Sequence, residues 1–268
     1  MNKKIGFIGC GKMASAIIGG VIASNYLSKE NIMAAEINEE KASEKSKELG
    51  IKVITDNNEL VNSVDVVFVA TTPNFVEGVL NGIKSSVTKD KLVVSIAAGV
   101  TTRFIESILG SDKRVVRVMP NTPALVLEGM SGVAGGTIAT EEDVQAVVEL
   151  LSNIGKAIEV TEEQLDIVTA ISGSGPAFYY KVINDIARAG EKMGMDYEKA
   201  LTLSIQTAIG SAKMLLSSDK SAEDLIASVA TKGGCTRVGV DYMEEVDTAD
   251  MFYNLIEKTA EKAHALGK

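Results

Sequence analysis

A glycine-rich motif near the N-terminus has the residue types and spacing of a ligand-binding turn. Gly9, Gly11 and Ala14 form the pattern G-x-G-x-x-A between the predicted strand Lys4–Ile8 and an apolar segment typical of a helix. Gly9 permits a tight turn, Gly11 lets the backbone approach a pyrophosphate, and Ala14 allows close helix–strand packing. The helix N-terminus adds N–H donors and the positive end of its dipole. The motif therefore predicts a dinucleotide-binding turn.

An acidic residue follows this motif at the distance expected of a ribose ligand. Glu36 lies 22 residues past Ala14, near the end of the predicted strand Asn31–Ile37. A carboxylate there accepts hydrogen bonds from the adenosine ribose hydroxyls and repels a 2′-phosphate. Glu36 thus disfavours the alternative of a glycine turn without a ligand, and taken alone it favours NADH over NADPH.

Three further segments lie where later strands are predicted to end: Ala70–Pro73, Ile96–Gly99 and Met119–Pro123. Ligands of open parallel sheets bind beyond the carboxyl ends of the strands. Small residues in the first two segments would let a nicotinamide ring and its phosphates lie against the backbone, and Asn121 could hydrogen-bond near the reacting face. Each segment taken singly also fits an ordinary strand–helix loop.

Two glycine-rich interruptions stand out in the second half of the chain. Ser172–Pro176 and Thr231–Thr236 each precede a predicted helix. Successive N–H groups at such a helix start form an anion site suited to a carboxylate, and the hydroxyls of the threonines can donate or accept. A plain interhelical turn would not need this density of Gly and Thr.

The composition excludes several other chemistries. His264 is the only histidine in the 268 residues, so a site that needs two or three histidine ligands is impossible, and we predict no metal. A Ser-His-Asp or Cys-His pair could use only this residue of the polar C-terminal segment, where we expect it to be solvated. The two cysteines, Cys10 and Cys235, make no disulfide framework, which fits a reducing compartment.

The charge balance bears on partners and location. Lys and Arg number 27 against 36 Asp and Glu, a net charge of −9, and no basic run is longer than Lys3–Lys4. Nucleic-acid binding therefore has no electrostatic support, and a small-molecule ligand is favoured. The longest uncharged stretch, Met13–Ser28, is too short and too polar to span a bilayer. We expect a cytoplasmic protein.

The elements that must position these residues follow a regular order up to Val160. Short β-branched runs alternate with helix-like segments, the pattern of parallel strands with crossover helices. Val66–Ala70 and Leu92–Val94 are apolar throughout, as in strands covered on both faces. We therefore predict an α/β fold with a doubly wound parallel sheet. The expected strands are Lys4–Ile8, Asn31–Ile37, Lys52–Ile54, Val64–Ala70, Leu92–Ala97 and Val115–Met119, and the expected helices include Glu39–Leu49, Asn74–Ser85, Thr101–Leu109 and Glu141–Asn153.

The pattern changes after Val160. Thr161–Gln164 forms a capping box, and long helical patterns replace the strand-like runs. We place a domain boundary here, which gives a Rossmann-type dinucleotide-binding domain over residues 1–160 and an all-α domain over residues 161–268. Tyr197–Ser218 is apolar nearly all round, which predicts a subunit interface as well as a core. The other helices expected in this domain are Glu162–Ile171, Pro176–Met193, Ala222–Ala230, Thr236–Glu244 and Thr248–Ala265.

Several blocks of the chain, in this order, resemble the Δ1-pyrroline-5-carboxylate reductases. The similarity runs through Gly6–Met13, Ser95–Gly99, Arg117–Pro123, Ser172–Ala177 and, most specifically, Leu225–Gly239. It implies NAD(P)H-dependent reduction of L-1-pyrroline-5-carboxylate to L-proline, the last step of proline biosynthesis. It also implies a Rossmann domain joined to an all-α dimerisation domain, in a homodimer that in this family often assembles further into a decamer.

The same resemblance assigns roles to individual residues. Thr236 corresponds to the residue that meets the ring nitrogen, which makes it the expected catalytic residue, and Cys235 to the one whose backbone N–H meets the carboxylate. The expected substrate-binding residues are Asp219, Thr231, Gly234, Cys235 and Thr236. The expected cofactor-binding residues are Ile8, Gly9, Cys10, Gly11, Lys12, Met13, Glu36, Asn57, Ala70, Thr71, Thr72, Pro73, Ile96, Ala97 and Ala98, to which Asn121 is added because it lies beyond the end of a predicted strand.

Two positions depart from the family pattern. Thr72 stands where the family usually has Lys, and Lys232 stands where Pro usually precedes Gly-Gly. Thr72 lacks the positive charge of the usual Lys, and Glu36 places a negative charge at the ribose position. Both features disfavour the 2′-phosphate of NADPH. Members of the family usually prefer NADPH, so the sequence leaves both NADH and NADPH as candidates. Lys232 either adds charge near the substrate carboxylate or is a solvated loop residue.

The absence of a usable histidine suits an imine substrate. A protonated imine already carries the charge that attracts hydride, whereas a carbonyl reductase needs an acid such as His, Lys or Tyr. The rate enhancement of hydride transfer would then come mostly from positioning the imine and the cofactor relative to one another. One alternative is a β-hydroxyacid dehydrogenase of the same two-domain plan, with Lys181 and Asn184 as catalytic groups, although their spacing from Gly175 does not match that class. The other is a non-catalytic dinucleotide-binding regulator.

Overall fold

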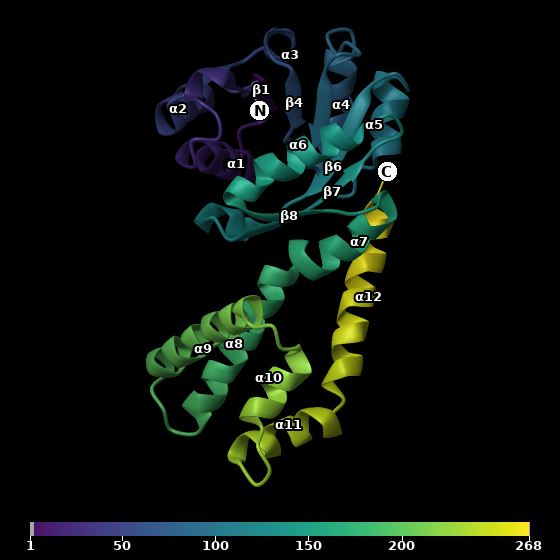
Figure 1. Ribbon diagram of the computed structural model, residues 1–268. Helices are drawn as coiled ribbons and strands as arrows, with labels where there is room; N and C mark the ends of the chain where they lie inside the picture. Colours follow the sequence, from purple (N-terminus) through teal and green to yellow (C-terminus); the bar gives the residue numbers. More distant parts are fainter. Residues whose placement is uncertain (1–2, 268) are drawn as a thin grey trace. The chain divides into compact units, whose positions relative to one another are not determined.

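The computed structural model describes residues 3–267 and divides them into two compact units (Figure 1). The first unit holds the chain up to Ser174 together with the stretch from Lys258 onward, and the second holds Gly175–Glu257. The division between compact units thus falls after Ser174, 14 residues beyond the domain boundary expected at Val160. The intervening residues form short helical turns that belong to the first unit.

The first unit is built on one eight-stranded sheet within the described residues, with the order β3-β2-β1-β4-β5-β6-β7-β8. All neighbouring strands are parallel except β6 and β7, which pair antiparallel. The α/β class is therefore confirmed. The strands are β1 (Ile5–Ile8), β2 (Ile32–Ala35), β3 (Lys52–Ile54), β4 (Val66–Val69), β5 (Leu92–Ser95), β6 (Arg114–Met119), β7 (Gly129–Gly135) and β8 (Gly155–Glu159).

The reversal at β7 corrects the expectation of a purely parallel sheet. Only residues 120–128 connect β6 to β7, whereas a parallel crossover needs about a dozen residues or more. The connection is a 3₁₀ turn, Thr122–Val126, followed by Leu127 with a φ of +60°. Strand β7 could not be predicted from its residues, because Gly-Met-Ser-Gly-Val-Ala-Gly contains few of the residues that favour strands.

Helices cover both faces of this sheet, which explains why its central strands are apolar throughout. Every residue of β4 is buried, and Phe7 of β1 stacks on Phe68 of β4 with ring centroids 4.6 Å apart. One face packs mainly on α1 (Lys12–Ala23) and α6 (Glu141–Leu151), and the other on α3 (Asn57–Ser63), α4 (Pro73–Ile83) and α5 (Thr102–Leu109). The charged helix α2 (Glu39–Leu49) has Ala42 as its only buried residue. The short helix α3 is absent from the elements expected from sequence.

The segment after Val160 is more broken than the single helix expected over Glu162–Ile171. It forms a 3₁₀ turn, the short helix α7 (Leu165–Val168) and a π-helical turn over Thr169–Gly173. The hydroxyls of Thr169 and Ser172 bond to backbone carbonyls four residues earlier, a competition that bends helices. The capping box itself is present, with Thr161 N donating to Gln164 Oε1 at 2.9 Å.

The second unit is all helical in its described residues, as expected. It contains α8 (Gly175–Lys192), α9 (Tyr197–Ser217), α10 (Ala222–Val229), α11 (Cys235–Glu245) and the first part of α12 (Thr248–Leu266). Asp196 and Ser221 cap α9 and α10 by accepting from backbone N–H groups of the first turn. Helices α8 and α9 pack together, and Ser204 Oγ donates to Ile183 O at 3.0 Å. No helix in the described part of the chain is both long enough and apolar enough to cross a membrane.

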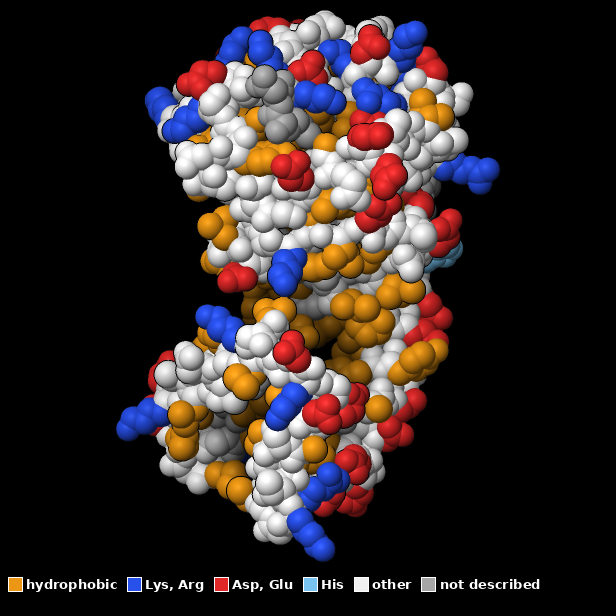
Figure 2. Space-filling view, viewed as in Figure 1, with side chains coloured by type: hydrophobic (Ala, Val, Ile, Leu, Met, Phe, Trp, Pro, Cys, Tyr) orange, Lys and Arg blue, Asp and Glu red, His pale blue; other side chains and the backbone are white. Residues whose placement is uncertain are grey.

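Most large apolar side chains of this second unit lie on its surface. Its helices bury only Gly175, Ala187, Ala200 and Ser204, to which the following turn adds Ala230. Figure 2 shows orange side chains scattered over the visible face of these helices, among polar and charged ones. Exposed members include Tyr179, Ile186, Leu203, Ile209, Met214, Leu216, Val229, Val238, Tyr242 and Tyr253. Because monomeric proteins rarely expose so much apolar area, this surface is typical of one covered in an assembly.

Candidate functional site

The turn after β1 has the shape that dinucleotide-binding loops require. Gly9 follows the buried strand with a φ of +93°, and its N–H donates to Ala35 O at 2.9 Å. A methyl group built on Gly9 would lie 2.8 Å from the carbonyl oxygen of Ala70, so no side chain fits there. Gly9 thus lets the chain turn between the ends of β2 and β4.

The N-terminus of α1 is open at the same place. Gly11 precedes this helix without a side-chain cap, and the first turn carries no acidic residue. A methyl group on Gly11 would meet nothing within 4 Å, so the backbone there borders free space. The uncapped N–H groups of a helix start are a ready-made site for a pyrophosphate. Lys12 lies exposed at the helix start, next to the half-buried Met13.

The residues around this turn are packed rather than reactive. Ile8 and Cys10 are buried, as is Ala14 on the first turn of α1. Burial raises the pKa of the Cys10 thiol, against a smaller opposing influence of Lys45, so the thiol is protonated near neutral pH. Cys10 therefore acts as a small packing residue of the turn.

Glu36 occupies the predicted ribose position. It directly follows β2, its N–H donates to Ile54 O at 2.9 Å, and its side chain is half-buried. Its Oε1 accepts from the N–H of Asn38, the residue that caps α2. The fixed backbone holds this carboxylate at the edge where β1, β2 and β3 end.

The loop after β4 meets the same edge. Thr71 packs its methyl group near Gly9, and its Oγ1 is buried without a hydrogen-bond partner among the described residues. Thr72 precedes α4 without capping it, and Pro73 begins that helix. An orphaned hydroxyl beside an open helix N-terminus is what a polar ligand would satisfy. The residues present therefore fit a dinucleotide.

The remaining predicted cofactor residues follow the strands at the carboxyl edge of the sheet, but one of them, Asn121, is already hydrogen-bonded. Ile96, Ala97 and Ala98 follow β5, and Asn57 begins α3 just beyond β3, at the carboxyl edge of the sheet. Asn121 lies in the loop after β6, but both ends of its amide are already used. Its Nδ2 donates to Ser172 O at 3.0 Å, and its Oδ1 accepts from Met130 N at 2.8 Å. Asn121 thus ties its own loop to β7.

In the second unit, the loop between α10 and α11 gathers most of the predicted substrate residues. The chain turns at Thr231–Gly234, where Gly234 N donates to Thr231 O at 3.0 Å and Gly233 has a φ of +81°. Gly234 precedes α11 without a side-chain cap, and the first turn, Cys235 and Thr236 included, has no acidic residue. This helix start can bind a carboxylate, as the sequence predicts.

Thr236 also lines a cavity of about 630 Å³ between α9, α10 and α11. The other lining residues are mostly apolar, among them Met214, Leu225 and Val240. Asp219 stands apart from this loop, because it precedes α10 whereas Thr231 follows it, and a helix of this length spans roughly 12 Å. Within this unit the structure therefore brings together every predicted substrate residue except Asp219. Lys232 is exposed.

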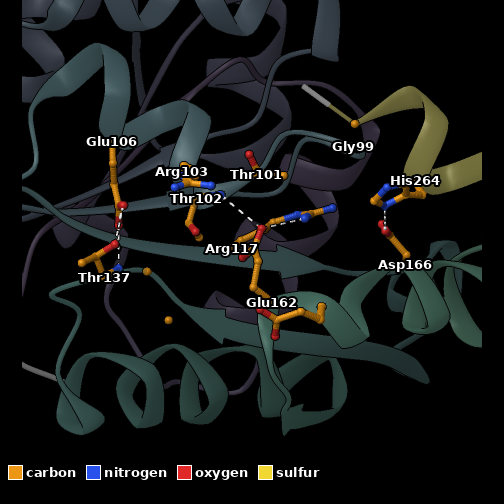
Figure 3. Close-up of a pocket in the computed structure, with 14 residues that line it drawn as sticks. Gly99, Thr101, Thr102, Arg103, Glu106, Arg117, Thr137, Glu162, Asp166 and His264 are labelled. Atoms are coloured by element: carbon orange, nitrogen blue, oxygen red, sulfur yellow. Dashed lines mark hydrogen bonds and ion pairs between the residues drawn. The ribbon is translucent and has the colours of Figure 1, made fainter.

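A second set of polar side chains lines a cavity of about 880 Å³ in the first unit (Figure 3). No role for these side chains was predicted from the sequence. Arg117 is buried in the middle of β6 and donates from Nη1 to Glu162 Oε1 at 2.8 Å. The same oxygen accepts from Thr102 N at 3.2 Å. Glu106 accepts from both N and Oγ1 of Thr137 at 2.7 Å. These bonds hold α5 and the 3₁₀ turn Glu162–Gln164 on the sheet, and among the described residues they leave Glu162 Oε2 buried without a partner.

Three other residues considered in the sequence, His264, Lys181 and Asn184, behave as surface groups, although His264 also lines the edge of the cavity in Figure 3. The side chain of His264 is 84% exposed, as expected, although its Nδ1 lies 3.0 Å from Asp166 Oδ2. Lys181 pairs with Asp185 on the exposed face of α8, and Asn184 accepts from the hydroxyl of Tyr197. The described residues contain no cluster of His, Cys, Asp and Glu that could hold a metal ion.

Comparison with known proteins gives a consistent family. A family model described as pyrroline-5-carboxylate reductase dimerisation matches residues 162–266, and one described as NADP oxidoreductase, coenzyme F420-dependent, matches residues 4–99. The chain is 42% identical over 267 residues to the pyrroline-5-carboxylate reductase of Methanosarcina acetivorans, which covers 100% of this chain and 99% of that protein.

Solved structures agree with the sequence relatives. A pyrroline-5-carboxylate reductase from Coxiella burnetii matches with a TM-score of 0.95 at 31% identity over 100% of both chains. The pyrroline carboxylate reductase of Plasmodium falciparum, solved with NADP bound, matches with a TM-score of 0.87 at 32% identity over 100% of this chain and 99% of that one. By sequence and fold, the chain belongs to the pyrroline-5-carboxylate reductase family.

Proposed function

We propose that this protein reduces L-1-pyrroline-5-carboxylate to L-proline, the last step of proline biosynthesis, with NADH or NADPH as the hydride donor. The observation that carries the proposal is the uncapped start of α11 at Gly234–Thr236, next to a threonine hydroxyl, in a chain that also has an open dinucleotide turn at Gly9–Gly11. A carboxylate site and a dinucleotide site are the two things this reaction requires. Full-length relatives of the same family support it.

The residues at the start of α11 have separate tasks in this proposal. The N–H groups of Gly234, Cys235 and Thr236 hold the substrate carboxylate, because the positive end of the helix dipole favours an anion there. The hydroxyl of Thr236 orients the iminium nitrogen, and Thr231 adds a second hydroxyl at the same turn. The protonated imine carries its own activating charge, so Thr236 has to position the ring rather than supply a proton.

The cofactor set is proposed for the carboxyl edge of the sheet. The bound dinucleotide supplies the hydride. The N-terminus of α1 and the turn Gly9–Gly11 hold its pyrophosphate, Glu36 holds the adenosine ribose, and Thr71 offers its orphaned hydroxyl to the phosphates or riboses. The other residues of the set are Ile8, Lys12, Met13, Asn57, Ala70, Thr72, Pro73, Ile96, Ala97, Ala98 and, through its loop, Asn121.

Between the two nicotinamide cofactors, the local charges favour NADH. Glu36 would face a 2′-phosphate, and the first turn of α2 adds the carboxylates of Glu39 and Glu40. Thr72 supplies no positive charge where family members usually have Lys. The NADP found in the Plasmodium falciparum relative supports a nicotinamide dinucleotide for this chain without deciding between the two.

We further propose a homodimer formed through the helical unit, in the cytoplasm, with a decamer as a higher assembly. The exposed apolar helices α8 to α11 and the match to a dimerisation model support the dimer. We keep residues 1–160 as the dinucleotide-binding domain and residues 161–268 as the dimerisation and substrate-binding domain.

Nicotinamide absorbance tests the proposal directly. The full chain is mixed with pyrroline-5-carboxylate and either NADH or NADPH, and the loss of absorbance is followed together with the formation of proline. We expect turnover with both cofactors and a higher kcat/KM with NADH. Cofactor binding without turnover would instead support a regulator, and turnover only with a β-hydroxyacid and NAD would support the dehydrogenase alternative, although Lys181 is engaged with Asp185 on the surface.

A further inference from the structure

The turn between β5 and α5 has an unusual requirement for glycine. Residues Ala97–Val100 form this turn, with Val100 N donating to Ala97 O at 3.4 Å. Gly99 occupies its third position with a φ of +73°, a conformation that other residues rarely adopt. Ile96, Ala97 and Ala98 of the proposed cofactor set lie immediately before Gly99. The conformation of this turn therefore decides where those three residues lie.

The last turn of α12 packs against Gly99. A methyl group built on Gly99 would lie 3.1 Å from the carbonyl oxygen of Leu266 and 3.5 Å from Gly267 N. Gly99 is buried although it belongs to a loop, and the end of α12 lies beside it in Figure 3. The backbone at the end of α12 thus occupies the space that a side chain at position 99 would need.

A second contact fixes the same helical turn. His264 Nδ1 lies 3.0 Å from Asp166 Oδ2, and Asp166 belongs to α7, whose Leu165 is fully buried. The His264 side chain is mostly exposed, so this contact alone is worth little in water. Together the two contacts attach residues 264–267 to the first unit, in agreement with the assignment of the chain from Lys258 onward to that unit.

We propose that the end of α12 together with the following Gly267, residues 264–267, is a positioning element for the cofactor loop Ile96–Ala98. By packing on Gly99 it restricts the turn Ala97–Val100 to the conformation in which Ile96, Ala97 and Ala98 present their backbone to the dinucleotide. This inference rests on the proposed function, because the loop has a cofactor to position only when the chain binds one. Positioning matters because a displacement of about 1 Å costs up to about a hundredfold in rate.

The experiment compares the full chain, a chain ending at Ala263, Gly99→Ala, and the shortened chain carrying Gly99→Ala. Each protein is titrated with NADH, by calorimetry and by nicotinamide fluorescence, and its Tm is recorded. Shortening should raise the Kd and the KM for NADH about tenfold, while the KM for the imine stays within about twofold, because the helix end contacts Gly99, which directly follows the cofactor loop.

The double substitution separates packing from backbone strain. In the full chain Gly99→Ala suffers both the positive φ and a tight contact of 3.1 Å with Leu266 O, whereas in the shortened chain only the positive φ remains. The effect of Gly99→Ala on the Kd should therefore be several-fold smaller in the shortened chain. His264→Ala should raise the Kd about twofold, and Lys262→Ala, an exposed position on the same helix, should leave it unchanged.

Two results would overturn the proposal. One is NADH binding by the shortened chain with the same Kd as the full chain, and the other is an equal cost of Gly99→Ala in both backgrounds. Gly99→Ala and His264→Ala retain the helix, so they test the same contact should the shortened chain lose its fold. If the full chain binds neither NADH nor NADPH, the proposed function is wrong and this inference is wrong with it. The titration of the unchanged protein shows this before any variant is made.

Discussion

The two compact units differ most in how much apolar surface they cover by themselves. The first unit buries every residue of β1, β4 and β5 under helices on both faces of the sheet. The second unit, of similar apolar character, buries five residues and leaves Leu203, Leu216 and Val238 exposed. The first unit thus has a complete core, whereas the helices of the second present a surface that needs a partner. The proposed dinucleotide site is therefore held in place by the core of its own chain. The proposed substrate loop belongs to helices that we expect to be stabilised by a second subunit.

The largest effect expected from this comparison is on the core of the first unit. Phe68→Ala should lower the free energy of unfolding by about 3–5 kcal/mol, because Phe68 is fully buried and stacked on Phe7. Chemical denaturation at several protein concentrations measures it, and the loss should not depend on concentration. Phe75→Ala is the matched control, since this side chain is 68% exposed, and a loss as large as that of Phe68→Ala would contradict the assigned core.

The substrate loop of the second unit gives the next effect. Thr236→Ala should lower kcat/KM for pyrroline-5-carboxylate by about a hundredfold, because the hydroxyl that orients the iminium is lost. The Kd for NADH should stay near that of the unchanged protein, since Thr236 is not part of the dinucleotide turn. Thr236→Ser keeps the hydroxyl and should retain most of the activity. Unchanged turnover in Thr236→Ala would remove this residue from the mechanism.

An exposed apolar position in the second unit tests the dependence on assembly. Leu203→Glu on α9 should shift the protein towards monomers by at least about tenfold in dimer dissociation constant, because a buried charge without a partner is costly. Sedimentation over a range of concentrations measures the shift. Ile138→Glu, at an exposed apolar position of the first unit, should leave the assembly intact. Equal behaviour of the two variants would show that the exposed helices are not the interface.

The smallest expected effect concerns cofactor choice in the first unit. Glu36→Ser should move the ratio of kcat/KM values towards NADPH by about tenfold, because the carboxylate that repels a 2′-phosphate is removed. Titration with both cofactors gives the corresponding Kd ratio without turnover. Glu59→Ser, a carboxylate paired with Lys52 on the surface, serves as the control for a change of net charge. A ratio that does not respond to Glu36→Ser would exclude this residue from selectivity.

Local patterns in the sequence predicted most of the fold. The apolar strands and the helices α8 to α12 fall within a few residues of their expected bounds, because hydrophobic periodicity and turn residues act locally. The strand β7 and the helix α3 were missed, since a glycine-rich strand and a seven-residue helix are held by packing rather than by their own propensity. The π-helical turn before α8 was missed because side-chain hydroxyls interrupt a segment that looks helical.

The candidate sites show the same division. The glycine turn at Gly9 and the helix start at Gly234 were predictable, because only certain residues permit those backbone conformations. The cavity beside α5 was not, although Arg117 within the otherwise apolar run Val115–Met119 is a signal that could have found it. The bonds that occupy Asn121 were likewise hidden, since Ser172 lies 51 residues away in the sequence.

By itself the sequence determined which segments could bind a dinucleotide and a carboxylate, because these depend on glycine, small residues and helix starts within a few positions of one another. Only the tertiary structure decided which groups are left free to do so. It leaves Thr71 Oγ1 without a partner among residues 3–267, engages the amide of Asn121, and brings the end of α12 against Gly99 across more than 160 residues of chain. The reason is physical: backbone conformation is a local property, whereas burial and hydrogen-bond partners are set by whatever distant segment packs alongside.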